Sequence, residues 1–159
     1  MLSQLERLSR ELDGRYASDA ELAFVIDYVR SFNLRVQTYQ KLQELESTIV
    51  QQACVKMRAI DPGVFVGKNQ EDLTRKCVRD LVYGLRATAL AVLLNDPDAL
   101  QEELLLWLQT IMRSLGKSHV CDIMYSALQD VIKQHLTPPQ ANLVCPLLES
   151  NRRILGPTA

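Results

Sequence analysis

An all-α fold is predicted for this chain by two observations. Apolar residues recur at intervals of three and four positions through most of the sequence, which is the spacing of one helical face. Proline, glycine and capping residues divide this pattern into about seven or eight helices, and no segment predicts a sheet. With 159 residues the chain fits one domain, spanning residues 1–159.

The first predicted helix covers residues 2–12 and ends before Gly14. Ser3 and Glu6 have the spacing of a capping box at its start, and Ser18 and Glu21 repeat that signal for a second helix. The apolar stripe of the first helix is made of leucines, namely Leu2, Leu5, Leu8 and Leu12.

The second helix carries a longer stripe, which we expect to form one buried face. A following segment runs through Ile49, Ala53 and Met57. It ends at Asp61-Pro62-Gly63, because proline cannot donate the helical hydrogen bond and glycine tolerates a positive φ. The residues of the long stripe are Leu22, Val25, Val29, Phe32, Val36, Tyr39 and Leu42.

Residues 64–70 are predicted to form a loop, and the next helix starts at Glu71. Asp96 as N-cap and Pro97 at the first helical position open another helix, which ends before Gly116. We interpret Trp107 and Met112 as ordinary core residues. The stripes of the two helices are Leu73, Cys77, Leu81, Leu85, Ala89 and Val92, then Leu100, Leu104, Trp107, Leu108, Ile111 and Leu115.

Two further helices complete the predicted fold. One covers about residues 121–136, and the last opens at Thr137-Pro138-Pro139. Pro146 should break or kink this last helix, since a proline inside a helix removes one hydrogen bond and clashes with the preceding turn. Gly156 and Pro157 terminate it.

Composition excludes several classes of function. A formal net charge of −1 with dispersed basic residues argues against nucleic-acid binding. No segment has the ~20 apolar residues of a membrane span, so we expect a soluble, intracellular protein without membrane insertion. The four cysteines have neither zinc-ligand spacing nor a disulfide pattern, and His119 and His135 are interpreted as solvated or capping residues. We therefore expect no metal site.

Cys77, Arg79 and Asp80 place a thiol, a guanidinium and a carboxylate within about one helical turn. A linear tetrapyrrole uses all three groups: the thiol can form a thioether, the guanidinium can hold a propionate, and the carboxylate can accept pyrrole N–H bonds. The alternative is a structural cysteine, because free cysteine usually behaves as a small core hydrophobe.

Several short strings carry further information through their order and spacing. They are Leu12-Asp13-Gly14-Arg15-Tyr16-Ala17-Ser18, Ile49-Val50-Gln51-Gln52-Ala53, Cys77-Val78-Arg79-Asp80-Leu81, Tyr83-Gly84-Leu85-Arg86 and Ser114-Leu115-Gly116. Together these strings resemble the phycobiliproteins, the light-harvesting bilin proteins of cyanobacteria and red algae, and most closely the allophycocyanin subunits. The resemblance covers nearly all of the chain.

The resemblance implies a globin-like helical domain, preceded by an N-terminal helical pair that serves subunit association. It implies a light-harvesting protein without enzymatic turnover, carrying one linear tetrapyrrole, expected to be phycocyanobilin, linked by a thioether to Cys77. By the family pattern Asp80 accepts bonds from the central pyrrole nitrogens and Arg79 pairs with a propionate. Tyr83 and Gly84 belong to the pocket, where a small residue at position 84 leaves room for a flat ligand.

The resemblance also implies an interface. Asp13, Arg15 and Tyr16 lie in the segment that packs on a partner subunit, and Arg86 resembles the arginine that meets the partner's aspartate. The expected partners are α-type and β-type phycobiliprotein subunits or a second copy, with phycobilisome linker proteins, at the cytoplasmic face of the thylakoid membrane. The alternative is that the N-terminal stripe folds back on its own domain.

Departures from the family keep a second function open. The loop at 67–70 is shorter and lacks the family's Asn-Ala-Tyr tyrosine, its Tyr-Tyr-Leu-Arg becomes Tyr83-Gly84-Leu85-Arg86, and Met112 and Trp107 replace a tyrosine and a small residue. A non-pigmented scaffold or assembly factor is therefore the alternative. An enzyme is the weakest hypothesis, because no Ser/His/Asp set, phosphate loop or His-Glu-x-x-His motif is present.

Overall fold

The fold was examined in a computed structural model that describes residues 1–157, with the backbone only for Lys68. Within these residues the structure is helical, with one isolated bridge between Val66 and Asp72. The prediction of an all-α fold is confirmed. The helices are α1 (Leu2–Glu11), α2 (Asp19–Ile60), α3 (Thr74–Leu94), α4 (Pro97–Leu100), α5 (Leu106–Ser114), α6 (Ser118–His135) and α7 (Pro138–Leu155), with a 3₁₀ turn η1 (Lys68–Gln70) and a π-helical segment η2 (Gln101–Leu105).

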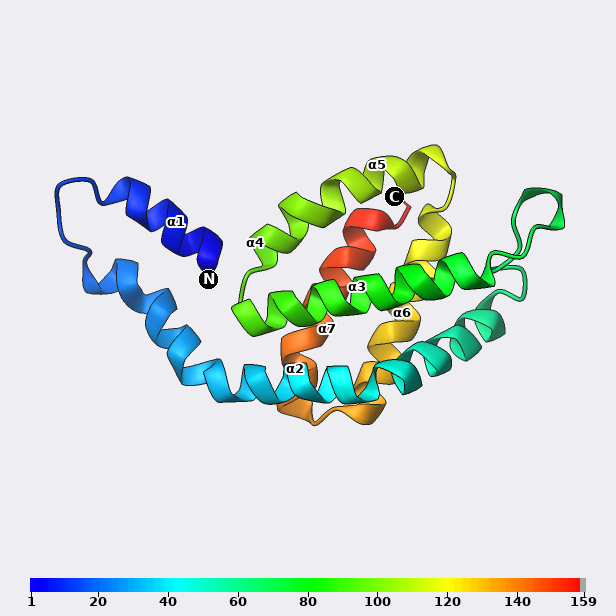
Figure 1. The fold of residues 1–159 in the computed structure, drawn as a ribbon, viewed down its shortest axis with the longest axis horizontal. Helices are drawn as coiled ribbons and strands as arrows, with labels where there is room; N and C mark the ends of the chain where they lie inside the picture. The colour runs from blue at the N-terminus through cyan, green and yellow to red at the C-terminus, as the bar shows by residue number, and fades with distance from the viewer. Residues whose placement is uncertain (158–159) are drawn as a thin grey trace.

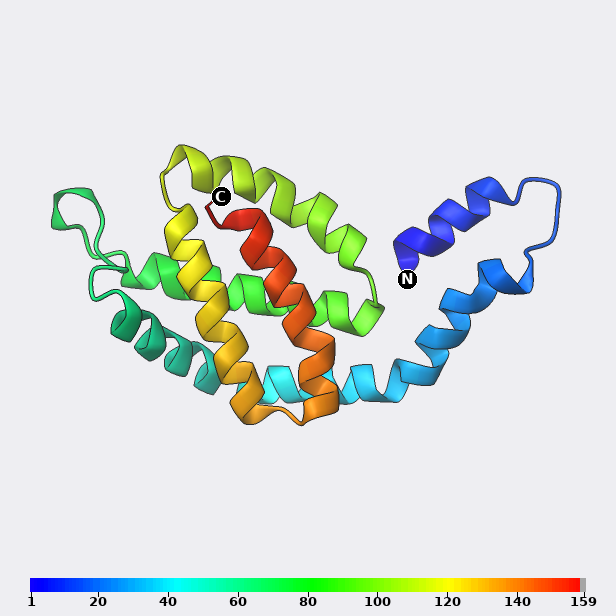
Figure 2. The ribbon, with the colours of Figure 1, turned by 180° about the vertical axis from the view of Figure 1, so that it is seen from behind.

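The helices form a packed body with an arm at one end (Figure 1). Helix α2 runs as a long arc beneath α3, and α6 and α7 pack against each other and against α2. The rear view shows α6 and α7 side by side across the body (Figure 2). Helix α1 and the first half of α2 form the arm, which projects beyond the body (Figure 1).

The core lies between α2, α3, α6 and α7. The predicted residues Ile49, Ala53 and Met57 of α2 are fully buried, as are Leu81 and Val92 of α3. The periodicity of these segments therefore identified the core correctly. Helices α6 and α7 complete it with Tyr125, Leu128, Val131, Ile132, Val144, Leu148 and Leu155.

The predicted burial of the long stripe on α2 is wrong for its first half. Val29 is 67% exposed, and Leu22 and Phe32 also face solvent, while Leu42, further along, is buried. The physical reason is that α2 is one helix of 42 residues whose first half extends into the arm, beyond the helices that cover its second half. The arm consequently presents an apolar surface made of Leu22, Ile26, Val29 and Phe32, which we call the arm face.

The two predicted capping boxes differ in outcome. Ser18 accepts from the Glu21 amide and Glu21 accepts from the Ser18 amide, so the start of α2 is confirmed. The box at Ser3 is wrong, because α1 starts at Leu2 and the Ser3 amide instead donates to Asp96 Oδ2 over 2.8 Å. This bond ties the start of α1 to the turn between α3 and α4.

The helix predicted from Pro97 to Gly116 forms as α4, η2 and α5 in succession, with Asp96 as its N-cap. Leu100 and Leu104 are buried as predicted, but Trp107, Ile111 and Leu115 are exposed. The π-helical segment η2 contains Leu104 and precedes the exposed residues, and its wider turn shifts the stripe around the helix axis. The prediction of Trp107 as core is therefore wrong, whereas Met112 packs against the core.

Two boundaries also differ from the sequence prediction. Helix α3 starts at Thr74 rather than Glu71, because Gly67 donates a backbone bond to Glu71 and holds that segment as part of the loop. Helix α7 continues through Pro146 without a break. Val144 and Leu148, which flank this proline, are fully buried, so packing compensates for the lost helical bond.

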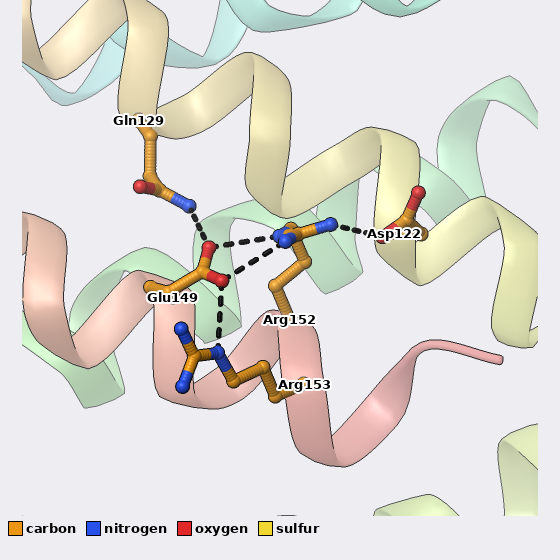
Figure 3. A network of polar contacts seen from close by, with 5 residues as sticks. All are labelled: Asp122, Gln129, Glu149, Arg152 and Arg153. Carbon is orange, nitrogen blue, oxygen red and sulfur yellow. Dashed lines mark hydrogen bonds and ion pairs between the residues drawn. The ribbon is translucent and has the colours of Figure 1, made fainter. Parts of the chain in front are cut away.

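Helices α6 and α7 are also joined by a polar network at their surface (Figure 3). Glu149 accepts hydrogen bonds from Arg152, Arg153 and Gln129 at 2.8–3.0 Å. Arg152 also donates to Asp122 over 2.7 Å. Because Glu149 and Arg152 lie on α7 while Gln129 and Asp122 lie on α6, the network clamps the two helices together.

Among the helices of residues 1–157, none combines the length and apolar character needed to cross a membrane.

Candidate functional site

Helix α3 places the predicted site residues along one side of its first half. Cys77, Asp80 and Gly84 are separated by three and four positions and therefore share a face. The start of the helix is held by the loop before it, because the Leu73 amide donates to Phe65 O over 2.8 Å and both Val64 and Phe65 are buried. This anchoring fixes the position of Cys77 relative to the loop.

This face borders a cavity of about 500 Å³ lined mainly by residues of α3, α5 and α6, with Met57 of α2 also in its wall. Most of the lining side chains are apolar, which is typical of small-molecule sites. Of the five predicted pigment-site residues, four line the cavity and Arg79 does not. Its principal walls are Cys77, Asp80, Tyr83 and Gly84 of α3, Trp107, Leu108 and Met112 of α5, and Cys121, Met124 and Tyr125 of α6.

The charged groups of the cavity come from α3, the loop before it and the start of α6. Arg79 lies on the exposed side of α3 and reaches Asp80 over 3.3 Å. Lys76 is paired with Glu71 at 2.7 Å. Lys117, at the start of α6, also lines the cavity and was not identified from the sequence. Its side chain lies opposite α3 only because the turn after α5 reverses the chain, which no local motif reveals.

The Cys77 thiol is partly buried and remains reduced. Burial raises the pKa of Cys77, the Asp80 carboxylate adds to the rise, and Lys117 opposes it. A second thiol, Cys121, lines the same cavity, and burial raises its pKa to about 11. Both thiols are therefore protonated at neutral pH, and neither is a spontaneously reactive nucleophile.

Gly84 lines the cavity and also packs against Tyr125 of α6. A Cβ at this position would lie 3.1 Å from the Tyr125 hydroxyl, closer than an ordinary contact. The space that a side chain at position 84 would enter is therefore occupied by Tyr125. Glycine inside a helix costs about 1 kcal/mol relative to alanine, so its presence in α3 needs a packing reason, which Tyr125 supplies.

The predicted interface residues lie on the arm side of the body. Arg86 makes two bonds of 2.7 Å to Glu46 of α2. It lines a groove of about 1000 Å³ between α1, α2, α3 and α4. Tyr83, which is largely exposed, borders both this groove and the cavity.

Asp13, Arg15 and Tyr16 lie in the turn after α1. Arg15 is paired with Glu21 at 2.6 Å, Tyr16 is 99% exposed, and Asp13 is exposed. Within residues 1–157 no polar contact joins Asp13 to Arg86. The structure therefore brings together Cys77, Asp80, Tyr83 and Gly84, while the interface residues occupy two separate places.

The chain is similar to known proteins over most of its length. The family model described as phycobilisome protein matches residues 8–155. The chain is 30% identical over 114 residues to allophycocyanin alpha chain 2 of Microchaete diplosiphon, covering 69% of this chain and 70% of that protein. It is 31% identical over 110 residues to the allophycocyanin beta chain of Anabaena cylindrica, covering 68% of each.

The family has a globin-like all-α fold, and its members are light-harvesting pigment proteins rather than enzymes. They carry covalently linked linear tetrapyrroles and assemble as α/β subunit oligomers in phycobilisomes, peripheral to the thylakoid. With a family match over almost its whole length and an all-helical structure, this chain belongs to the phycobilisome protein family, the family of the bilin-binding phycobiliproteins.

Proposed function

We propose that this chain is an allophycocyanin-like light-harvesting subunit that carries one phycocyanobilin, linked by a thioether to Cys77. One observation carries the proposal: Cys77, Asp80 and Tyr83 line a single, mainly apolar cavity of about 500 Å³. Apolar walls with a few placed polar groups fit a flat conjugated ligand that bears two carboxylates. The bound bilin supplies the absorption of light, and the protein fixes its shape and surroundings.

Each polar residue of the cavity has a separate task in this proposal. The Cys77 thiol adds across a carbon–carbon double bond of the pigment, so that its proton is transferred to the pigment and no atom is lost. Asp80 turns from Arg79 and accepts hydrogen bonds from the central pyrrole nitrogens. Lys117, which lines the cavity, and Arg79, which lies next to Asp80 in the sequence, pair with the propionates.

Association is proposed to use the arm. The arm face and the groove beside Arg86 are apolar surfaces that α-type or β-type subunits, or a second copy, would cover. Asp13 of one subunit would then meet Arg86 of its neighbour, in competition with Glu46. Phycobilisome linker proteins are further proposed partners, in an assembly at the cytoplasmic face of the thylakoid membrane.

A non-pigmented scaffold remains the second candidate, favoured by one observation. Tyr125 fills the space beside Gly84, which reduces the room for a pigment next to α3. A scaffold would keep the arm face and the fold while its cavity stays empty.

The test is expression of the full chain together with a bilin-making pathway and the matching lyases. Mass spectrometry of the tryptic peptides should show one pigment per chain on the peptide that contains Cys77, with a mass equal to the sum of both parts. Cys77→Ala should lose the adduct, whereas the control Cys145→Ala, on α7 outside the cavity, should keep it. An uncoloured wild-type protein would favour the scaffold, and an adduct on another cysteine would overturn the assignment of Cys77.

A further inference from the structure

Side chains of α3 and α6 line the cavity together and come into contact at Gly84 and Tyr125. On α3, Gly84 follows Cys77 and Asp80 on the same side of the helix, and on α6 Cys121 and Tyr125 lie four positions apart. Tyr125 is 1% exposed and is the largest fully buried side chain among the described residues. Its phenol forms part of the cavity wall beside Gly84.

The fit between Tyr125 and Gly84 is close. A Cβ at position 84 would lie 3.1 Å from the Tyr125 hydroxyl oxygen, but 3.7 and 3.8 Å from the two nearest ring carbons. Only the hydroxyl would therefore be displaced by a methyl group at position 84. The ring carbons would remain at ordinary contact distance.

Helix α3 cannot easily recede from Tyr125. The Thr88 hydroxyl donates to Gly84 O over 2.8 Å, and Asn151 Nδ2 of α7 donates to Thr88 Oγ1 over 3.1 Å. Thr88 and Asn151 are fully buried, so this chain of bonds holds the turn of α3 that contains Gly84. Burial also raises the pKa of Tyr125 well above its usual range, which keeps the phenol neutral.

We propose that Tyr125 is a positioning residue for the pigment: seated against Gly84, its ring forms a rigid inner wall that limits how deeply the bilin enters and how far it can twist. This inference rests on the proposed function, because it assigns a task to a wall of the same cavity. A fully buried tyrosine packed against Gly84 moves little, so the pigment beside it loses the torsional freedom that would dissipate excitation.

The experiment compares purified, pigmented variants by adduct mass, absorption and fluorescence yield. Tyr125→Val should keep one pigment per chain but lower the fluorescence yield several-fold and weaken the red band relative to the near-ultraviolet band. Tyr125→Phe should resemble the wild type. Gly84→Ala should reproduce part of the defect, and the double variant Gly84→Ala with Tyr125→Phe should regain the spectrum of Tyr125→Phe, because the displaced hydroxyl is gone.

The matched control is Leu128→Ala, which truncates a fully buried residue of the same helix outside the cavity. It should lower the melting temperature without changing the spectrum or yield per pigment. The inference is overturned if Tyr125→Val leaves the spectrum and yield unchanged at full adduct mass, or if Leu128→Ala changes them equally. Absence of pigment from the wild type would instead refute the proposed function itself, and the mass measurement separates that result from the spectral ones.

Discussion

The acidity of the Cys77 thiol determines how a pigment can be attached. Burial and the Asp80 carboxylate raise the pKa of Cys77, so only a small fraction is thiolate at pH 7. Alkylation of Cys77 by iodoacetamide should therefore be slower than that of a free cysteine and should accelerate about tenfold per pH unit up to its pKa. Peptide mass spectrometry after timed alkylation measures this rate.

Cys121 is the internal control for this measurement. It is more deeply buried, and its pKa is raised to about 11, so it should react more slowly than Cys77 at each pH. A rate at Cys77 that is already maximal at pH 6 would mean that its thiolate is stabilised, contrary to the geometry of the site.

Asp80 is expected to tune the pigment without holding it covalently. Asp80→Asn should leave the adduct mass unchanged but weaken and blue-shift the red absorption band. A carboxylate opposite the pyrrole nitrogens favours the protonated, extended bilin, and a neutral amide holds that form less firmly. Absorption spectra of the purified adducts test this prediction. A spectrum identical to that of the wild type would show that Asp80 does not contact the pigment.

At the scale of elements, the clamp between α6 and α7 depends on the charge of Glu149. Hydrogen bonds from Arg152 and Gln129 lower the pKa of Glu149 in the folded protein. A group with a lowered folded-state pKa stabilises the fold above its unfolded pKa, and this contribution is lost as the pH falls. The stabilisation should therefore be present at pH 7 and decrease progressively below about pH 4.5.

Glu149→Gln tests this contribution. It should lower the urea midpoint at pH 7, and the difference from the wild type should narrow as the pH is lowered to 3. Glu6→Gln, which removes an exposed partner of Arg10, should have almost no effect at either pH. An equal loss for Glu149→Gln at pH 7 and pH 3 would show that shape rather than charge matters at this position.

The positions of most helices could be predicted from the sequence, because helical periodicity and capping residues are local signals. The surface that covers an apolar stripe depends on contacts between residues far apart in the sequence. The stripes of α2 and α5 have the same spacing at exposed residues such as Val29 and Trp107 as at buried ones. An apolar stripe indicates that something covers it, without revealing whether the cover belongs to the same chain.

The residues that line the cavity could likewise be predicted only in part. Cys77 and Asp80 were predicted because they share one turn of one helix. Tyr125 and Lys117 were not, since they reach the cavity from α6, far along the chain. Gly84 was predicted as a pocket residue from the sequence, but its contact with Tyr125 is evident only in the folded chain.

At the scale of the whole molecule, the arm should determine assembly. Removal of residues 1–12, or Asp13→Arg, should convert an oligomer into monomers, because the groove beside Arg86 would lose its partner. Breaking an interfacial ion pair from one side costs about 2–5 kcal/mol. Sedimentation velocity at tens of micromolar, alone and with allophycocyanin subunits added, measures the change.

Glu46 provides the control for this prediction. Glu46→Gln should free the Arg86 guanidinium from its partner within the chain and strengthen assembly, while Asp13→Arg with Arg86→Asp should restore it in part. A wild-type protein that sediments as an 18.0 kDa monomer under both conditions would refute the association.

Tyr83 borders both the cavity and the groove, so one exposed side chain separates the proposed places of pigment and partner. A partner bound in the groove would restrict the rotamers of this tyrosine, and this would shift the absorption wavelength of the pigment beside it. The absorption spectrum would then show whether the subunit is assembled. Free and assembled copies in a mixture could be counted by colour, without a label and without separating them.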